Sequence, residues 1–358
     1  VHGHGHSRLC SVDPGLLRMT RRATFIFGSI VFILFGFQIS EAQYIPGGFW
    51  ARGKLLGVSW ASSTFKVYNS KGMSSYPSPG TPPAGNVNAI AFSADGKLMG
   101  LAHATSPFIT IYNTLDWSKI ANPAVLPANI GRGVAFNTSG TLMAVAHASS
   151  PYITIYNTSD WSKLANPGTL PANLSVGVAF SPDDSKMAVV HSFSPYVTIY
   201  NTSDWSKIAN PAVLPSNTGY SVAFSPDNSI MAVGHATSPF VTMYNTSDWS
   251  KIANPGTLPA GTVFGVAFSP DGSKLATAHT TSPYVTIYNT SDWSKVANPA
   301  TLPTGAGNGI DWNADGSRLA VGHSTSPFLT VYDTSNWVKM NDPGSLPGGG
   351  ATGVAYTK

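Results

Sequence analysis

A segment of 44 residues recurs along most of this 358-residue chain. Two markers show the period, namely a tryptophan that follows Asp or Asn and a histidine that ends an apolar run. The tryptophans are Trp117, Trp161, Trp205, Trp249, Trp293 and Trp337. The histidines are His103, His147, His191, His235, His279 and His323. A fixed period of this length is typical of repeat architectures and constrains the fold more than any other feature.

Each repeat predicts four short strands, as the copy over residues 265–308 illustrates. GVAFS at 265–269 is rich in β-forming residues and is followed by a Pro-Asp-Gly-Ser turn. LATAH at 275–279 and YVTIYN at 284–289 alternate in the manner of half-buried strands. A Thr-Ser-Asp turn then predicts a fourth strand, WSKVA at 293–297, before a loop of the form NPxxLP. No helical periodicity interrupts this pattern.

Seven units can be counted, because the end of the first strand recurs seven times. Its last residues are Phe92, Phe136, Phe180, Phe224, Phe268, Trp312 and Tyr356. Four strands per unit and seven units predict an all-β fold, a seven-bladed β-propeller of four-stranded blades over residues 43–358. The repeats begin on a second strand near Lys54 and end on a first strand at 353–356. The C-terminal strand is therefore expected to complete the first blade and close the ring.

The segment before the repeats reads as a targeting sequence. Residues 19–42 begin with Met19, carry Arg21 and Arg22, continue in an apolar run and end in Ala42 before Gln43. This pattern predicts a cleaved signal peptide. The protein is therefore expected to be secreted, extracellular or on the cell surface, with the periplasm as an alternative. An uncleaved anchor is the competing interpretation, but the run is short for a membrane span. Residues 1–18 are interpreted as upstream or non-native sequence. They contain the single cysteine, so no disulfide is expected.

The repeat resembles WD40 repeats and the related YVTN-type propeller repeats, as found in bacterial and phage surface proteins. The residues that carry the resemblance are GVAFSPDGSKLA, the alternating second strand and TIYN. Tyr288-Asn289 stands where WD40 repeats have the WD dipeptide, and NPxxLP replaces their Gly-His pair. The resemblance implies the architecture, while the intracellular partners of WD40 proteins do not carry over.

The repeated histidines and tryptophans each have two interpretations. The histidines could form a ring of metal sites, but equivalent residues of neighbouring blades lie too far apart to share an ion. A structural role at a strand end, bonding loop backbone within the blade, is favoured, and no metal or cofactor is predicted. The tryptophans could stack on sugars as in a multivalent lectin. Covering the outer edge of each blade is the favoured interpretation, with glycan binding kept as the alternative function.

Catalysis finds little support in the sequence. The only glutamate is Glu41, and most aspartates occupy turn positions that turn chemistry explains. Only Asp311 and Asp342 fall outside these repeated positions. No GxSxG, P-loop, CxxC or HExxH motif occurs. Charged residues make up 10% of the chain against a usual level of about 25%, without a basic run. A non-enzymatic protein that does not bind nucleic acid is therefore expected, with an enzyme whose active site lies at the channel mouth as the third hypothesis.

One position varies sharply among otherwise similar copies, the last residue before each first strand. Its occupants are Asn88, Arg132, Val176, Tyr220, Phe264, Asn308 and Thr352. We expect these residues around the mouth of the central channel, forming one asymmetric face that binds an extracellular or cell-surface protein, with Arg132, Tyr220 and Phe264 as anchors. The competing interpretation is that this position is merely unconstrained. The oligomeric state is left open.

Six Asn-x-Ser/Thr sequons are candidate glycosylation sites in a host that glycosylates secreted proteins. They are Asn137, Asn157, Asn173, Asn201, Asn245 and Asn289. Four of them share one hairpin position, which is expected on the face opposite the channel mouth.

Overall fold

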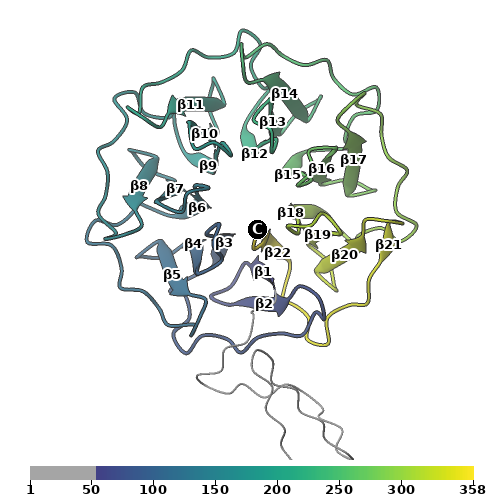
Figure 1. Cartoon of the computed structure of the whole chain (residues 1–358), viewed down its shortest axis with the longest axis horizontal. Helices are drawn as coiled ribbons and strands as arrows, with labels where there is room; N and C mark the ends of the chain where they lie inside the picture. Colours follow the sequence, from purple (N-terminus) through teal and green to yellow (C-terminus); the bar gives the residue numbers. More distant parts are fainter. Residues whose placement is uncertain (1–53) are drawn as a thin grey trace, which may run out of the picture. The chain divides into compact units, whose positions relative to one another are not determined.

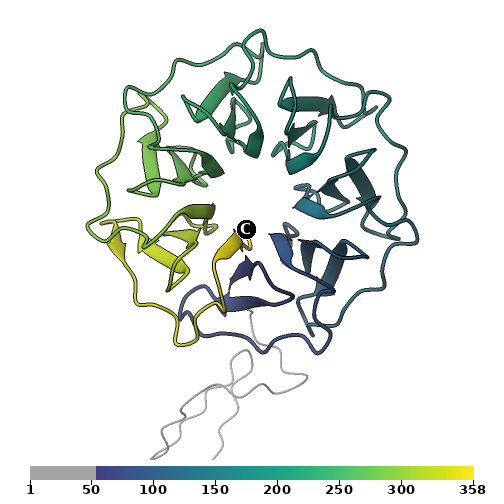
Figure 2. The same cartoon turned by 180° about the vertical axis from the view of Figure 1, so that it is seen from behind.

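The computed structural model describes residues 54–358, and this part of the chain consists of strands, turns and loops. It forms 22 β-strands arranged in seven sheets around a common centre (Figure 1). The same arrangement is seen from behind in Figure 2. An all-β fold is confirmed, and the seven sheets are compatible with a seven-bladed propeller. The predicted signal peptide at 19–42 and the segment 1–18 lie outside the described residues.

Every sheet has an innermost, a middle and an outer strand, joined in antiparallel order (Figure 1). The innermost strands are β3 (Val87–Phe92), β6 (Gly131–Phe136), β9 (Ser175–Phe180), β12 (Gly219–Phe224), β15 (Val263–Phe268), β18 (Gly307–Trp312) and β22 (Ala351–Tyr356). The middle strands are β1 (Leu55–Trp60), β4 (Leu98–His103), β7 (Leu142–His147), β10 (Lys186–His191), β13 (Ile230–His235), β16 (Lys274–His279) and β19 (Arg318–His323). The outer strands are β2 (Phe65–Asn69), β5 (Ile109–Asn113), β8 (Ile153–Asn157), β11 (Val197–Asn201), β14 (Val241–Asn245), β17 (Val285–Asn289) and β20 (Leu329–Asp333).

The predicted fourth strand is wrong for six of the seven sheets. In its place stands a single bridge, such as that between Tyr288 and Lys295. Two backbone features keep the pairing short, and the sheet that retains two residues of it shares them, since Trp337 has a φ of 59°. Trp293 adopts a left-handed conformation with φ of 58°, which takes the chain out of the extended geometry. Pro299 then lacks the N–H that further pairing would need. Only one sheet keeps a fourth strand, the two-residue β21 (Val338–Lys339).

The first and last strands of the described chain belong to one sheet. β22 pairs antiparallel with β1, with Gly57 opposite Ala355 and Val58 opposite Val354, and β1 pairs on its other side with β2. A sheet composed of β2, β1 and β22 thus draws on both ends of the repeat region.

The hydrophobic core lies between neighbouring sheets. In one cluster Val285 and Ile287 of β17 meet Ile310 and Trp312 of β18 and Val321 of β19. Clusters built from equivalent strands occur between other neighbouring pairs, for example around β8 and β10. Because each sheet buries its faces against its two neighbours, the repeats stabilise one another.

A buried tyrosine in each outer strand attaches the interblade loop to its sheet. The hydroxyl of Tyr288 donates to the backbone carbonyl of Thr257 at 2.8 Å, and Tyr332 makes the same bond to Thr301. Burial raises the pKa of Tyr288 above its usual value. The hydroxyl therefore stays protonated and able to donate. In the described part of the chain, no helix is long and apolar enough to cross a membrane.

Candidate binding site at the channel mouth

A β-bulge lies near the start of the innermost strand of every sheet. In β15 the pairing to β16 runs from Val263 opposite His279 directly to Gly265 opposite Ala278, which leaves Phe264 as the extra residue. A bulge leaves one residue unpaired and re-aims its side chain. The same step in register occurs in the other six innermost strands.

The seven bulge residues are the seven that vary between repeats, Asn88, Arg132, Val176, Tyr220, Phe264, Asn308 and Thr352. The sequence places them one step before the first strand, whereas the structure makes each of them the second residue of that strand. The displacement has a physical reason. The first residue of the strand already pairs with the repeated histidine, as Gly131 does with His147, or with Trp60 in the sheet of β22, so the strand starts before the bulge.

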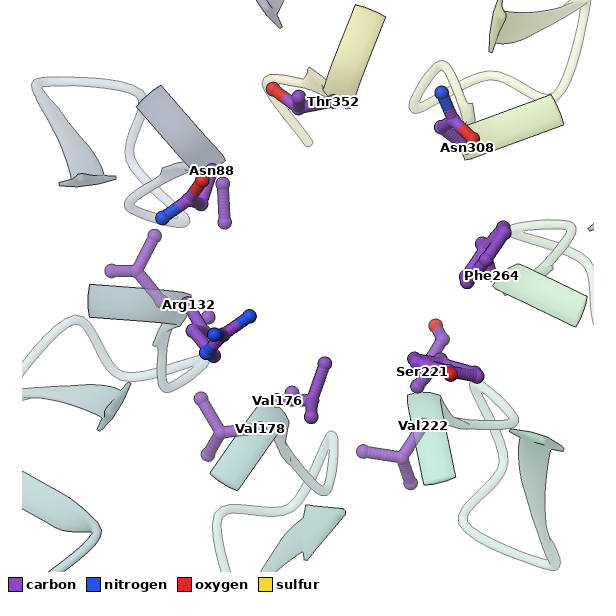
Figure 3. A pocket seen from close by; sticks show the side chains of 14 residues that line it. Asn88, Arg132, Val176, Val178, Ser221, Val222, Phe264, Asn308 and Thr352 are labelled. Carbon is purple, nitrogen blue, oxygen red and sulfur yellow. The ribbon is translucent and has the colours of Figure 1, made fainter. Parts of the chain in front are cut away.

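All seven bulge residues line one cavity of about 410 Å³, which we call the mouth cavity (Figure 3). It lies where the innermost strands begin, at their N-terminal ends. Arg132 and Phe264 lie on opposite sides of the cavity in Figure 3, and Val176 lies between them along its lower rim. A volume of this size fits a small ligand or one or two residues of a peptide.

Small residues follow the bulge in every innermost strand. They are Ala89, Gly133, Gly177, Ser221, Gly265, Gly309 and Gly353. A Cβ atom on Gly177 would stand 3.0 Å from the carbonyl oxygen of Tyr220, and one on Gly133 would stand 2.9 Å from that of Val176. Neighbouring backbones thus approach closely just behind the bulges. The chemical differences around the cavity mouth therefore come chiefly from the bulge side chains.

Three adjacent bulge residues bond the neighbouring strand. Asn88 Nδ2 donates to the carbonyl of Gly131 at 2.7 Å, and Asn308 Nδ2 donates to that of Ala351 at 2.8 Å. Thr352 Oγ1 donates to the carbonyl of Val87 at 2.7 Å. These contacts connect innermost strands of successive sheets. This polar side of the cavity has a structural role that the sequence did not reveal.

The other four bulge residues form a side of different chemistry. The rings of Tyr220 and Phe264 meet edge to face, with centroids 4.7 Å apart and planes at 67°. In residues 54–358 Arg132 forms no ion pair, and its Nε is buried without a hydrogen-bond partner. An unpaired buried donor of this kind costs about 1–3 kcal/mol. The cavity therefore combines an apolar wall with a cation whose bonding capacity is unused by the protein.

One further side chain belongs to this face, and sequence reasoning missed it. Phe193 lies in the loop between β10 and β11, at the same end of the sheets as the bulges, and is 60% exposed. Equivalent loops carry Thr105, Ser149 or Thr237 at this position. The signal that could have found it is the same as for the bulges, a single copy that departs from its repeats.

The repeated histidines are buried and bonded within their own sheets. Nε2 of His279 lies 2.9 Å from Oγ1 of Thr286 in the adjacent outer strand, and all six histidines make this contact. Nδ1 of His191 lies 2.7 Å from the carbonyl of Phe193. Burial lowers the pKa of these imidazoles, so they stay neutral at pH 7. The pKa falls to about 4 for His147, His191, His235, His279 and His323. The pKa of His103 also lies below the usual value for histidine.

The histidine contacts support the structural interpretation, with a threonine as the regular partner in addition to loop backbone. Among residues 54–358, no three His, Cys, Asp or Glu side chains are grouped to hold a metal ion. The repeated tryptophans are half-buried and pack against the clusters between sheets. The ring centroids of Trp337 and Trp312, for example, are 6.0 Å apart. This packing supports their role as covers of the outer edge.

The aspartates serve turns and strand contacts. The hydroxyl of Ser269 and the N–H of Ser273 hold the pKa of Asp271 below its usual value, as expected for a turn residue. Asp311 accepts the N–H of Tyr356 and pairs with Lys358. Asp342 pairs with Lys339 at 2.8 Å.

The six sequon asparagines differ in exposure. Asn137 is 3% exposed, and its Nδ2 donates to Ser139, Thr141 and Asp184. Asn245 is exposed, while Asn157, Asn173, Asn201 and Asn289 are half-buried. The four hairpin asparagines end the outer strands β8, β11, β14 and β17, at the opposite end of the sheets from the bulges.

The comparisons with known proteins concern the fold alone. No family model matches the chain, and no curated protein matches it. Among solved structures, 1627 chains match, so the architecture is widespread and does not by itself define a function. One is hydrazine synthase of Kuenenia stuttgartiensis, with a TM-score of 0.59 and 17% identity, covering 69% of this chain and 76% of that one. The molecule is thus a β-rich repeat protein with a propeller-like arrangement.

Proposed function

We propose that this protein is a secreted, non-enzymatic binding or assembly module whose mouth cavity captures an extracellular or cell-surface protein. Its architecture would be a closed seven-bladed propeller related to WD40 and YVTN-type repeats, sealed by the pairing of β22 with β1. The secretion part of the proposal rests on the character of residues 19–42.

One observation carries the binding part of the proposal. The position at which the repeats differ is also the unpaired bulge residue of each innermost strand, and all seven bulge residues line one cavity. A bulge residue is left out of the strand pairing, which leaves its side chain to face the cavity. Asn88, Asn308 and Thr352 bond the neighbouring strand, whereas within residues 54–358 Arg132, Val176, Tyr220 and Phe264 make no such side-chain bond. Tyr and Arg are the residue types that most often dominate binding energy, and Tyr220, Phe264 and Arg132 occupy this cavity.

Capture of the native partner tests the proposal. The protein would be immobilised, exposed to the extracellular and surface fraction of its source, and the retained proteins identified by mass spectrometry. A variant with Arg132→Gln, Tyr220→Ala and Phe264→Ala is expected to lose the partner and keep its melting temperature. A matched triple variant at the opposite end of the sheets, Ser159→Ala, Ser203→Ala and Ser247→Ala, should retain it. Undiminished capture by the first variant would refute the proposal.

Multivalent glycan binding is the alternative. It would use the six repeated tryptophans, whose rings are half-buried at the outer edges of the sheets. A glycan array separates the two, because only the alternative predicts a glycan signal that falls when a single repeated tryptophan, such as Trp249, is replaced by alanine.

A further inference from the structure

The mouth cavity has a distribution of chemistry that specifies its occupant more closely, on the assumption that the proposed function holds. Arg132 is the only charged residue among the fourteen that line it. The lining contains no carboxylate to neutralise this cation. An anionic group on a ligand would therefore find an unpaired cation here, and the planar guanidinium favours a carboxylate, which it can bind through two parallel hydrogen bonds.

The wall across the cavity from Arg132 is apolar. Phe264 lies opposite Arg132 in Figure 3, and its ring is held by the edge-to-face contact with Tyr220. Val176 adds an aliphatic side chain to the same lining. A pair of rings fixed by mutual contact forms a preorganised surface for a third aromatic or large aliphatic group. The ligand thus carries an apolar group in addition to its anion.

The polar side of the cavity offers acceptors. Asn88 and Asn308 each commit Nδ2 to a carbonyl of the neighbouring strand. This bond fixes the orientation of the amide and leaves Oδ1 able to accept a hydrogen bond. A ligand N–H would match these oxygens. Peptide groups supply such donors, whereas simple organic acids do not.

We propose that the mouth cavity binds the C-terminal residue of a partner polypeptide, an aromatic or large aliphatic residue with its free α-carboxylate. The carboxylate lies on Arg132, the side chain packs against Phe264 and Tyr220, and backbone N–H groups meet Asn88 or Asn308. The volume of about 410 Å³ accommodates one or two residues and excludes a folded domain. The exposed Phe193 lies on the same face and would contact the chain that leads away from the cavity.

The test uses three probes with the intact protein, namely acetyl-Gly-Gly-Phe with a free carboxylate, the same peptide as its C-terminal amide, and phenylacetate. Dissociation constants are measured by calorimetry or by NMR titration. The free acid is expected to bind about tenfold more tightly than the amide, because only the acid forms the charge-assisted pair. Phenylacetate is expected to bind more weakly than the acid peptide, because it lacks the N–H groups.

Variants assign the effect to the cavity. Arg132→Gln is expected to abolish the preference for the acid, and Arg132→Val serves as a second variant because the equivalent bulge at position 176 already carries valine. Phe264→Ala should weaken the acid and the amide alike. Lys207→Gln removes an exposed cation at the outer edge of its sheet and should change neither.

The inference would be overturned by equal binding of acid and amide, by no measurable binding of the acid, or by an acid preference that survives the Arg132 variants. Phenylacetate binding as tightly as the peptide would also contradict a chain end as occupant. The proposed function fails separately. If the triple variant loses its native partner while the peptides do not bind, the cavity binds protein by another chemistry. If the triple variant keeps its partner, the proposed function itself is wrong.

Discussion

The carboxylate of Asp311 in β18 accepts the backbone N–H of Tyr356 in β22 at 2.8 Å. The same carboxylate pairs with Lys358 at 2.6 Å. Other innermost strands carry alanine at this position, as Ala267 does in β15. Asp311 therefore attaches the last strand of the chain to the neighbouring sheet, while the pairing of β22 with β1 attaches it to the first.

Replacing Asp311 by alanine is expected to destabilise the protein by about 1–3 kcal/mol, the range for leaving a buried donor, here the N–H of Tyr356, without its partner. Urea unfolding measures this loss. Asp311→Asn provides the control, since it keeps an oxygen for the Tyr356 N–H and loses the ion pair, so its effect should be smaller. Equal stability of the alanine variant and the unaltered protein would show that this contact is not needed to hold β22.

Acidification is expected to destabilise the protein between about pH 6.5 and pH 4. The folded pKa of five histidines is about 4, below the unfolded value near 6.5. In this interval the unfolded chain binds protons that the folded chain does not. The contribution of each histidine to the free energy of unfolding is therefore fully present above pH 6.5. It falls as the pH drops, by at most about 1.4 kcal/mol per pH unit for each histidine.

The unfolding free energy measured at pH 7.5, 6.0 and 5.0 in constant salt tests this account. A steep decline supports burial of neutral imidazoles in several sheets at once. Replacing His279 by glutamine should make the decline shallower. A stability that stays level from pH 7.5 to 5.0 would show that the histidines are not buried as neutral groups.

The close approach of innermost strands predicts that alanine substitutions at two glycines differ sharply in their effect on stability. Gly133→Ala places a methyl group 2.9 Å from the carbonyl oxygen of Val176, so one of the backbones must shift. We expect a loss of about 1–3 kcal/mol. Gly168→Ala in an interblade loop meets nothing within 4 Å and should stay within about 0.5 kcal/mol. Similar effects at both positions, measured by thermal unfolding, would contradict the packing described behind the bulges.

The sequence contained enough information for the repeat number and for the order of the first three strands of each unit. The 44-residue period predicts seven units, and the incomplete first and last units predict the pairing of β22 with β1. The strands were predictable because alternation and turn residues depend on local sequence. The pairing of β22 with β1 was predictable because the first unit lacks the strand that the last unit supplies. The variable residues were also identified from sequence, since comparing the copies needs no coordinates.

Features set by backbone geometry, or by single contacts outside the repeat pattern, escaped prediction. The left-handed conformation of Trp293 shortens the expected fourth strand at its start, and no residue-type preference signals it. The bulge at Phe264 depends on the register of two strands. The role of Asp311 depends on Tyr356, which is 45 residues away. Phe193 is visible as a departure from the repeat, but its place beside the mouth requires the fold.

Site-directed photocrosslinking tests most directly whether the mouth cavity is the binding face. A photoreactive p-benzoylphenylalanine replaces Val176, a bulge residue of the cavity, or Ser203, an exposed hairpin residue at the opposite end of the same sheet. Each protein is illuminated in the native extracellular fraction, and adducts are identified by mass spectrometry. The account predicts a specific partner adduct from position 176 and none from position 203. An adduct from position 203 alone, or equal adducts from both, would contradict it.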